Sequence, residues 1–340
     1  MKTKTRAKNM GDIAVLANVS KPTVSRALRD SPLVTAETKA LVLEIARKHG
    51  YAVNRNAQKL RDKRTNTIAV VADFKSFPGS RLADPFSFEL LADVAQALSL
   101  RSQDLLLCAP AEESHETYQT LLASRHADGI IFLGQGQRDP MLRQLAKTDA
   151  AFVVWGAVAQ DQPYCAVGGA NVRGGELVGA RFAESKRRRA VFIGGSDEHL
   201  EMKQRRLGFE KALLAKQPSA SVGHIVVSNF SYESALAAMV AYLDGKNKNE
   251  YPDAIFAASD TIAMAVYKAL RDRGLSVPKD VSVIGYNDNP HAAWCSPSLT
   301  TIRQDTRQAG SLLVEQLMMM LEGRKPQSIM IPAELIVRES

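Results

Sequence analysis

The amino-acid sequence predicts a small all-α head followed by an α/β core of two doubly wound parallel-sheet lobes. Charge separates the two parts. Residues 1–64 hold 15 Lys and Arg against 5 Asp and Glu, a net charge of +10, whereas the rest hold 29 against 31, a net of −2. From about residue 67, short apolar runs alternate with amphipathic stretches, a pattern typical of parallel strands joined by crossover helices. A chain of 340 residues with 45% hydrophobic content is long enough for such a head and two lobes.

The head opens with a short helix. Asn9 is a suitable N-cap, because its side chain can accept the amide hydrogens of the first turn. Asp12, in that turn, suits the positive end of the helix. The face predicted to be buried carries Ile13, Leu16 and Ala17.

A tight turn leads into a second helix over residues 21–28. Asn18 falls where the turn needs a residue that tolerates a left-handed backbone, and Ser20 can cap the helix. Pro22 lies in the first turn, where its missing amide hydrogen costs little. The sides of this helix that are left to meet a phosphate or a base edge carry Lys21, Thr23, Ser25 and Arg26.

A third helix completes the head, with Thr35 as its N-cap and Gly50 after its end. Its predicted inward side chains are Leu41, Val42, Ile45 and Ala46. The arrangement is a helix-turn-helix layout, although many globular proteins contain a helical hairpin with no role in DNA binding. The clustered positive charge favours the DNA-reading interpretation over that plain one.

The rest of the chain alternates strands and helices. Eight runs are predicted as strands, at 68–72, 105–109, 129–133, 152–155, 190–193, 224–227, 254–257 and 281–285. Gly168-Gly169 and Gly174-Gly175 lack the spacing of a dinucleotide or phosphate loop, which favours turn formation and helix packing there.

The strings DIAxLAxVSxxTVSRAL, HGYAVNRNAQKLR and RTNTIAVV resemble the lactose-repressor (LacI/GalR) family of bacterial transcription factors, and the resemblance runs the length of the chain. It implies a helix-turn-helix DNA-binding domain over residues 1–53, a hinge helix or linker over 54–64, and an effector-binding and dimerisation domain over 65–340. That last domain would be periplasmic-binding-protein-like. Its N-lobe would take about 65–160 and 300–325, and its C-lobe about 161–299 and 326–340.

The resemblance also assigns roles within the head. Base contacts in the major groove are implied for Lys21, Pro22 and Arg26, and phosphate contacts for Ser20, Thr23 and Ser25. In the hinge, Leu60 matches a leucine that family members wedge into the minor groove, flanked by Ala57 and Arg61. Without the surrounding pattern, Leu60 would be interpreted as an ordinary apolar linker residue.

Ligands of such sheets bind between the lobes, at the carboxyl ends of the strands. The candidate effector site comprises Asp84, Phe86, Ser87, Trp155, Arg205, Phe230, Ser259, Asn287 and Gln304. An arginine, aromatic faces and short polar side chains suit a sugar, and they could also hold a purine or nucleoside. Asn287 and Ala170 stand where the family usually or often has Asp, so the pattern of hydroxyls that is recognised can differ.

Other features of the sequence limit the possible classes of function. Six histidines without metal spacing and three scattered cysteines predict no metal, no cofactor and reduced thiols. No apolar run reaches membrane-spanning length and the N-terminus lacks a signal-peptide core, so the prediction is a cytoplasmic protein with no membrane partner. The C-terminus carries no leucine heptads of the kind that build tetramers, which favours a homodimer.

The combined prediction is a non-enzymatic transcriptional repressor that binds double-stranded, pseudo-palindromic operator DNA. Binding of a small molecule, a sugar or sugar derivative, would close the lobes and change the order of the hinge segment. Two alternatives have other chemistry: a sugar-active enzyme with a DNA-binding head, and an architectural DNA binder that ignores small molecules. A nucleophile elbow, metal cluster or phosphate loop would favour the enzyme, and the sequence contains none of these motifs.

Overall fold

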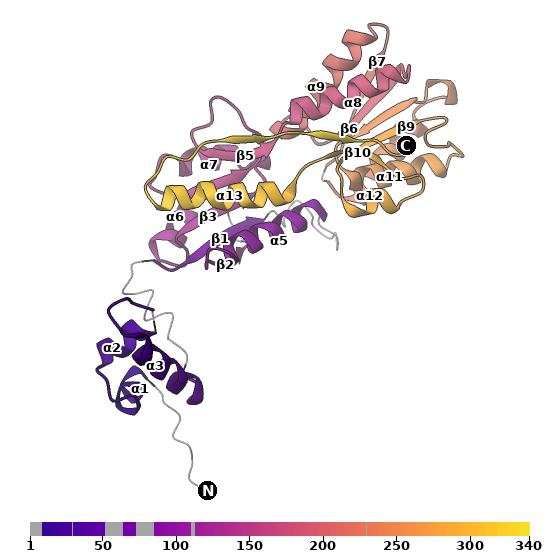
Figure 1. Ribbon diagram of the computed structural model, residues 1–340. Coiled ribbons are helices and arrows are strands. Elements are labelled where there is room, and N and C mark those ends of the chain that lie inside the picture. The colour runs from indigo at the N-terminus through magenta and orange to yellow at the C-terminus, as the bar shows by residue number, and fades with distance from the viewer. Residues whose placement is uncertain (1–8, 29, 52–63, 73–84, 110–112, 229) are drawn as a thin grey trace. The chain divides into compact units, whose positions relative to one another are not determined.

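The computed structural model describes residues 9–28, 30–51, 64–72, 85–109, 113–228 and 230–340 (Figure 1). It divides into two compact units, residues 1–65 and 66–340. The candidate residues Ala57, Leu60, Arg61 and Asp84 lie outside the described residues.

Within the described part of the head lie three helices, α1 (Met10–Leu16), α2 (Lys21–Ala27) and α3 (Ala36–Lys48). Each begins at the cap that the sequence predicts. The side chains of Asn9, Ser20 and Thr35 accept backbone N–H groups of the first turn at distances of 2.7 to 3.3 Å. Asn18, in the turn between α1 and α2, has the predicted left-handed backbone, with φ of 51°.

Two leucines of the head are not where the sequence analysis expects them. Leu16 is 49% exposed and Leu41 is 45% exposed, although both were predicted to face inward. The helices meet instead through a face rich in alanine, with Ile13, Ala14, Ala17, Val24, Ala27, Val42 and Ala46 buried. Small side chains let these short helices approach closely, which turns the two leucines toward the edge of the contact.

The core contains two six-stranded sheets in the described residues. Their strand orders are β11-β5-β4-β3-β1-β2 and β12-β10-β9-β8-β6-β7. In the described residues, every strand pairing is parallel except that of β10 with β12. The strands are β1 (Thr67–Ala72), β2 (Asp104–Cys108), β3 (Gly129–Leu133), β4 (Phe152–Trp155), β5 (Cys165–Gly169), β6 (Arg189–Gly194), β7 (Ser221–Val226), β8 (Ala254–Ala257), β9 (Ser282–Asn287), β10 (Thr300–Arg303), β11 (Ile329–Ile331) and β12 (Glu334–Ile336).

Helices cover both faces of each sheet, which confirms the doubly wound prediction. In the first lobe, Ile131 and Val153 pack toward α5 and α13, whereas Phe132 and Phe152 pack toward α6 and α7. The helices are α5 (Pro85–Ser99), α6 (His115–Ala123), α7 (Asp139–Leu145), α8 (Asn171–Glu184), α9 (Leu200–Lys216), α10 (Tyr232–Asp244), α11 (Asp260–Arg271), α12 (Pro290–Trp294) and α13 (Thr306–Leu321), with 3-10 turns η1 (Gly136–Arg138) and η2 (Lys248–Glu250).

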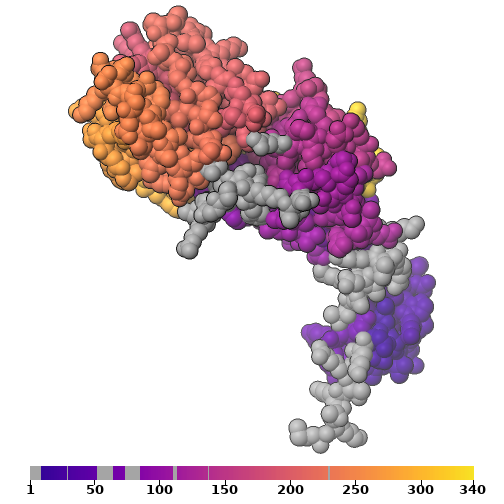
Figure 2. Space-filling model, turned by 180° about the vertical axis from the view of Figure 1, so that it is seen from behind, coloured from indigo at the N-terminus to yellow at the C-terminus, as the bar shows by residue number. Residues whose placement is uncertain are grey.

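The lobe boundaries differ from those predicted at 160, 299 and 325. β5 pairs with β4 in the first sheet, so the chain leaves the first lobe only after Gly169. β10 pairs with β9 and therefore belongs to the second sheet, and β11 returns to the first sheet before β12 joins the second. Sheet membership is set by these pairings between strands distant in the chain, which the sequence pattern does not show. Figures 1 and 2 show the yellow C-terminal segment on both lobes.

Candidate functional site

The predicted base-reading side chains of the head lie on α2. Lys21, Pro22 and Arg26 are exposed, whereas Val24 and Ala27 on the opposite side are buried in the head. The Lys21 stem lies along α1, since its Cε atom is 2.7 Å from the place that a Cβ of residue 11 would occupy. A glycine there gives this side chain its room.

The predicted phosphate contacts lie at the same end of the head. The Ser20 hydroxyl oxygen accepts the Thr23 N–H at 3.2 Å and lies 2.8 Å from the Thr23 hydroxyl. Ser25 is half-buried on the following turn. Ser20 and Thr23 therefore hold the start of α2 in place, whatever they contact on DNA.

The core holds a cavity between its two lobes, with a volume of about 170 Å³. It lies at the carboxyl ends of strands from both sheets, and eight of the predicted effector residues line it: Phe86, Ser87, Trp155, Arg205, Phe230, Ser259, Asn287 and Gln304. One water occupies roughly 10 to 15 Å³ of such a cavity. The cavity therefore has room for about as many water-sized groups as one hexose has non-hydrogen atoms.

Arg205 is the most firmly held of these side chains. Its Nε donates to Asn171 Oδ1 at 2.9 Å and its Nη1 donates to the Ala258 carbonyl oxygen at 2.7 Å. The guanidinium carbon lies 3.6 Å from the centre of the Tyr286 ring. These two bonds use two of the five N–H groups of the guanidinium, and those that remain include the N–H groups of Nη2. The arginine is thus oriented before any ligand arrives.

Glycines bring Asn171 and Arg205 together. They allow α8 and α9 to pack with their backbones in contact: a Cβ on Gly175 would lie 2.0 Å from the Arg205 carbonyl oxygen, and one on Gly208 would lie 2.0 Å from that of Val172. Because Asn171 begins α8 and Arg205 lies on α9, this close contact sets their separation. The packing role expected for Gly174-Gly175 is present at Gly175.

Asn287 and Gln304 form a second fixed pair. Gln304 Nε2 donates to Asn287 Oδ1 at 2.8 Å, so the amide oxygen of Asn287 is already engaged. Gln304 reaches this position past Gly169, where a Cβ would be 2.4 Å from its Oε1. Asn287 ends β9 with φ of 112°, a backbone conformation that side-chain-bearing residues rarely adopt.

Aromatic side chains close the cavity from both lobes. In the first lobe, the Phe86 and Trp155 rings are 5.7 Å apart and tilted by 41°. In the second, Phe230 meets the His199 ring edge-on at 5.4 Å. Ser259 also lines the cavity, but its oxygen accepts the Ile262 N–H and so caps α11. Its hydroxyl hydrogen can still be donated to a ligand.

Four polar residues that line the cavity were not predicted from the sequence: Arg138, Asn171, His199 and Glu201. Arg138 follows β3 and binds Glu113 through two hydrogen bonds of 2.7 and 2.8 Å. Asn171 follows β5, while His199 and Glu201 follow β6. Each comes after the carboxyl end of a parallel strand. Applying the strand-end rule to every predicted strand would have found Arg138, His199 and Glu201, whereas β5, which precedes Asn171, was not among the predicted strands.

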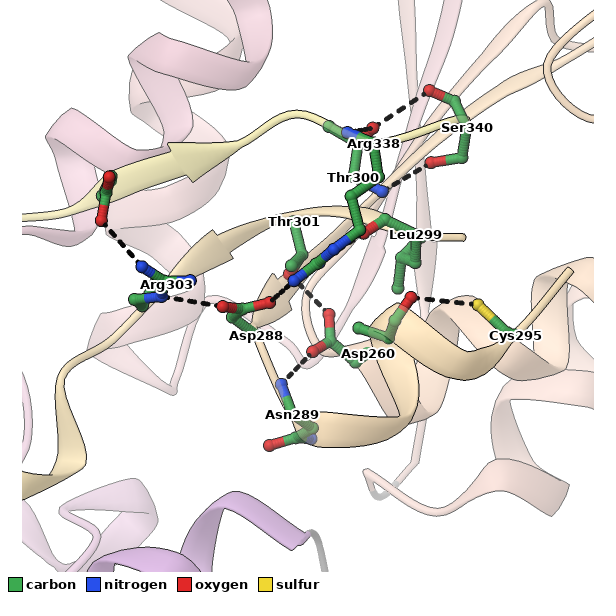
Figure 3. A network of polar contacts seen from close by, with 12 residues as sticks. Asp260, Asp288, Asn289, Cys295, Leu299, Thr300, Thr301, Arg303, Arg338 and Ser340 are labelled. Carbon is green, nitrogen blue, oxygen red and sulfur yellow. Dashed lines mark hydrogen bonds and ion pairs between the residues drawn. The ribbon is translucent and has the colours of Figure 1, made fainter. Parts of the chain in front are cut away.

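A polar network lies beside the cavity, at the point where the chain crosses between the lobes (Figure 3). The buried Asp260 accepts the Thr301 hydroxyl at 2.6 Å and the Asn289 N–H at 2.7 Å. Asp288 accepts from Arg303 at 2.8 Å and from Arg338 at 2.6 Å. These two carboxylates are committed to holding the chain segments around Asn287, which fixes the strained end of β9.

Comparisons with known proteins agree with this architecture. Residues 9–54 match the model of bacterial regulatory proteins of the lacI family, and residues 180–340 match a periplasmic binding protein-like domain. The chain is 31% identical over 335 residues to the HTH-type transcriptional regulator CelR of Thermobifida fusca, covering 96% of each protein. It belongs to the LacI family. It is therefore a helix-turn-helix transcriptional regulator that binds operator DNA.

Two solved structures extend the comparison. A transcriptional regulator CelR–cellobiose complex has a TM-score of 0.71 and 30% identity, covering 98% of this chain and 100% of that one. The lac repressor dimer bound to operator and the anti-inducer ONPF has a TM-score of 0.82 and 22% identity, covering 97% and 98%. The second likeness shows the shared fold. No described helix of this LacI-family regulator is long and apolar enough to cross a membrane.

Proposed function

We propose that this regulator is a repressor whose affinity for operator DNA is switched by a sugar or sugar derivative bound between its lobes. The observation that carries the proposal is the fixed Arg205 guanidinium, which lies in a cavity whose walls also hold aromatic rings. Such a site can bind the hydroxyls of a sugar and cover its apolar ring face. The complex of the related CelR with cellobiose supports the same class of ligand.

A ligand in this cavity would touch both lobes at once. Phe86 and Trp155 come from the first lobe, while Arg205 and Asn287 come from the second. A molecule that contacts both walls binds a closed arrangement more tightly than an open one, and so shifts the population toward closure. Coupling between two such sites is typically about 1 to 3 kcal/mol, a change of roughly 5- to 150-fold in DNA affinity.

The DNA contacts of the proposal rest on the exposed side of α2. Lys21, Pro22 and Arg26 would contact base edges, and Ser20, Thr23 and Ser25 the phosphates. In the hinge, Leu60 would enter the minor groove between Ala57 and Arg61. Two chains would bind a pseudo-palindromic site as a homodimer in the bacterial cytoplasm, without catalysing a reaction.

A purine or nucleoside is the alternative effector, since an aromatic ring of the cavity wall can also stack on a planar base. The experiment below separates the two ligand classes.

The test begins with selection of bound DNA from a random pool at a stated salt concentration. The selected site is then bound again in the presence of glucose, cellobiose, ribose and hypoxanthine, with recovery of each compound checked afterwards. We expect a palindromic site whose affinity changes with a sugar that is recovered intact. Binding without sequence preference, or a site that responds to no compound, contradicts the proposal, and consumption of a sugar indicates an enzyme.

A further inference from the structure

The polar groups on the cavity wall differ in how far the protein already uses them. Arg138 is 8% exposed, and its guanidinium is bound by both carboxylate oxygens of Glu113. The amide oxygen of Asn287 is taken by Gln304, and two donor groups of Arg205 are taken by protein oxygens. Towards a ligand, these side chains therefore offer hydrogen-bond donors, or a charge that another protein group already balances.

Glu201 differs from them. It lines the cavity in the first turn of α9, one helical turn before Arg205, and it is the one carboxylate among the described lining residues. Its carboxylate accepts a hydrogen bond from its own backbone N–H, and no ion pair joins it to another described side chain. Other carboxylates near the site, those of Glu113, Asp260 and Asp288, are bound to protein donors.

Burial raises the pKa of the Glu201 carboxyl, against the opposing effect of the Arg205 and His199 charges. A carboxylate offers about four lone-pair positions, and few of them are used here. An ionised group that has lost water without gaining partners costs free energy, and a ligand that donates hydrogen bonds to it removes that cost. Sugar hydroxyls on neighbouring carbons can donate to both oxygens of one carboxylate.

We infer that Glu201 is a specificity-determining residue, which accepts hydrogen bonds from two neighbouring hydroxyls of an uncharged sugar and rejects sugars that carry a carboxylate or phosphate. This inference rests on the proposed function. An anionic sugar would bring a like charge beside Glu201. Arg138 is already neutralised by Glu113, and the charge of Arg205, which is bonded to the neutral groups of Asn171 and Ala258, is offset by Glu201 itself. The ligand class is therefore a neutral polyhydroxylated molecule.

The experiment compares the full-length protein with its Glu201→Gln variant by isothermal titration calorimetry. The probes are glucose and cellobiose, which are neutral, and glucuronate and glucose 6-phosphate, which are anionic. The matched control is Glu198→Gln, which removes one negative charge three residues away, at an exposed position that does not line the cavity. Melting temperatures of the ligand-free proteins are measured alongside.

We expect the wild type and the control to bind a neutral probe at least about tenfold more tightly than either anion. In Glu201→Gln, affinity for that neutral probe falls by about 10- to 100-fold, in keeping with loss of a charge-assisted hydrogen bond. The preference of this variant for the neutral probe over the anionic probes also shrinks. The ligand-free melting temperature of this variant rises, because burial disfavours the charged carboxylate by more than the Arg205 and His199 charges favour it, whereas loss of a merely structural contact would lower it.

Two results overturn the inference while leaving the proposed function intact: tightest binding of an anionic probe by the wild type, or equal affinities of the wild type and Glu201→Gln for the neutral probe. If none of the probes binds and none alters operator affinity, the proposed function fails and the inference fails with it. The two failures are therefore distinguishable.

Discussion

The two lobes contribute different chemistry to the cavity between them. The first lobe supplies an apolar wall that includes Phe86 and Trp155, and the one charged lining residue described there, Arg138, is bound to Glu113. The second supplies most of the directional groups, among them Arg205 and Asn287. A hydroxylated ligand would therefore gain hydrogen bonds from the second lobe and apolar burial from the first. Affinity and closure should respond differently to substitutions in the two walls.

The largest expected effect comes from removing the fixed guanidinium of the second lobe. Arg205→Ala should weaken binding of the neutral sugar by about 100-fold, since hydrogen bonds to a charged group contribute about 1.5 to 3 kcal/mol. Operator binding without ligand should stay near the wild-type level. Calorimetry and gel-shift titration measure the two quantities.

The control is Arg206→Ala, which removes the neighbouring guanidinium that pairs with Asp197 and Glu210 and does not line the cavity. Equal losses of ligand affinity in both variants would show that Arg205 acts through the stability of α9 rather than through the ligand.

The next test concerns the packing of α8 against α9, which supports the polar wall of the second lobe. Gly175→Ala would place a Cβ 2.0 Å from the Arg205 carbonyl oxygen and should destabilise the protein by about 1 to 3 kcal/mol. Gly245→Ala is the control, since its Cβ would meet its nearest neighbour at 3.6 Å and should change stability by less than about 0.5 kcal/mol. Urea unfolding measures both. Equal stabilities would mean that the α8–α9 contact is not tight.

A substitution in the first lobe should act more on closure than on affinity. Trp155→Ala removes part of the apolar wall and should weaken ligand binding by only about tenfold, from lost burial. The ligand-induced compaction seen by small-angle X-ray scattering should shrink more than it does in Phe230→Ala, on the second lobe. If Phe230→Ala abolishes compaction and Trp155→Ala does not, the roles of the two lobes in closure and in affinity are the reverse of those expected.

The smallest expected effect is a pH dependence of ligand affinity. Glu201 must be ionised to accept two hydroxyls, and its pKa is raised by burial, so affinity for a neutral sugar should fall several-fold as pH falls through that raised pKa. His199 and Arg205 face the same carboxyl, and Arg138 across the cavity is paired with Glu113. Calorimetry from pH 8 to about pH 5 measures the slope. A Glu201→Gln variant with the same slope would show that Glu201 is not the group responsible.

In the ligand-free protein, the contribution of the Glu201 carboxyl to stability should change with pH in the direction opposite to its contribution to ligand affinity. An acid whose folded pKa lies above its unfolded value contributes stability at low pH, and that contribution is lost as pH rises through the folded pKa. The Glu201→Gln variant removes this contribution, so the difference in melting temperature between variant and wild type should grow with pH.

The comparison of lobes also shows what the sequence could predict. Local signals were sufficient for the caps at Asn9, Ser20 and Thr35, and the eight predicted strands each overlap an observed one. Burial of Leu16 and Leu41 was predicted wrongly, because periodicity defines a helical face but not how closely small residues let a neighbour approach. Lobe boundaries were shifted because sheet membership depends on long-range pairing.

The candidate site also has features that the sequence predicted and features that it did not. Side chains named by position at strand ends, such as Trp155 and Asn287, line the cavity, as does Arg205, which the family resemblance implied. Whether a side chain is available to a ligand was beyond the sequence, since it depends on partners distant in the chain. Arg138 is neutralised by Glu113, 25 residues away, and Asn287 is bound by Gln304, 17 residues away. Glu201 stands out because its bonds within the protein are few.

The glycine contact between α8 and α9 has a consequence for redesign. It fixes the arginine through backbone packing, so we expect exchanges of the side chains at positions 199 and 201 to leave Arg205 in place. New sugar preferences can therefore be selected in a library confined to these two positions, on an unchanged scaffold. The protein then becomes a starting point for a family of genetically encoded sensors, each reporting a different ligand through the same DNA output.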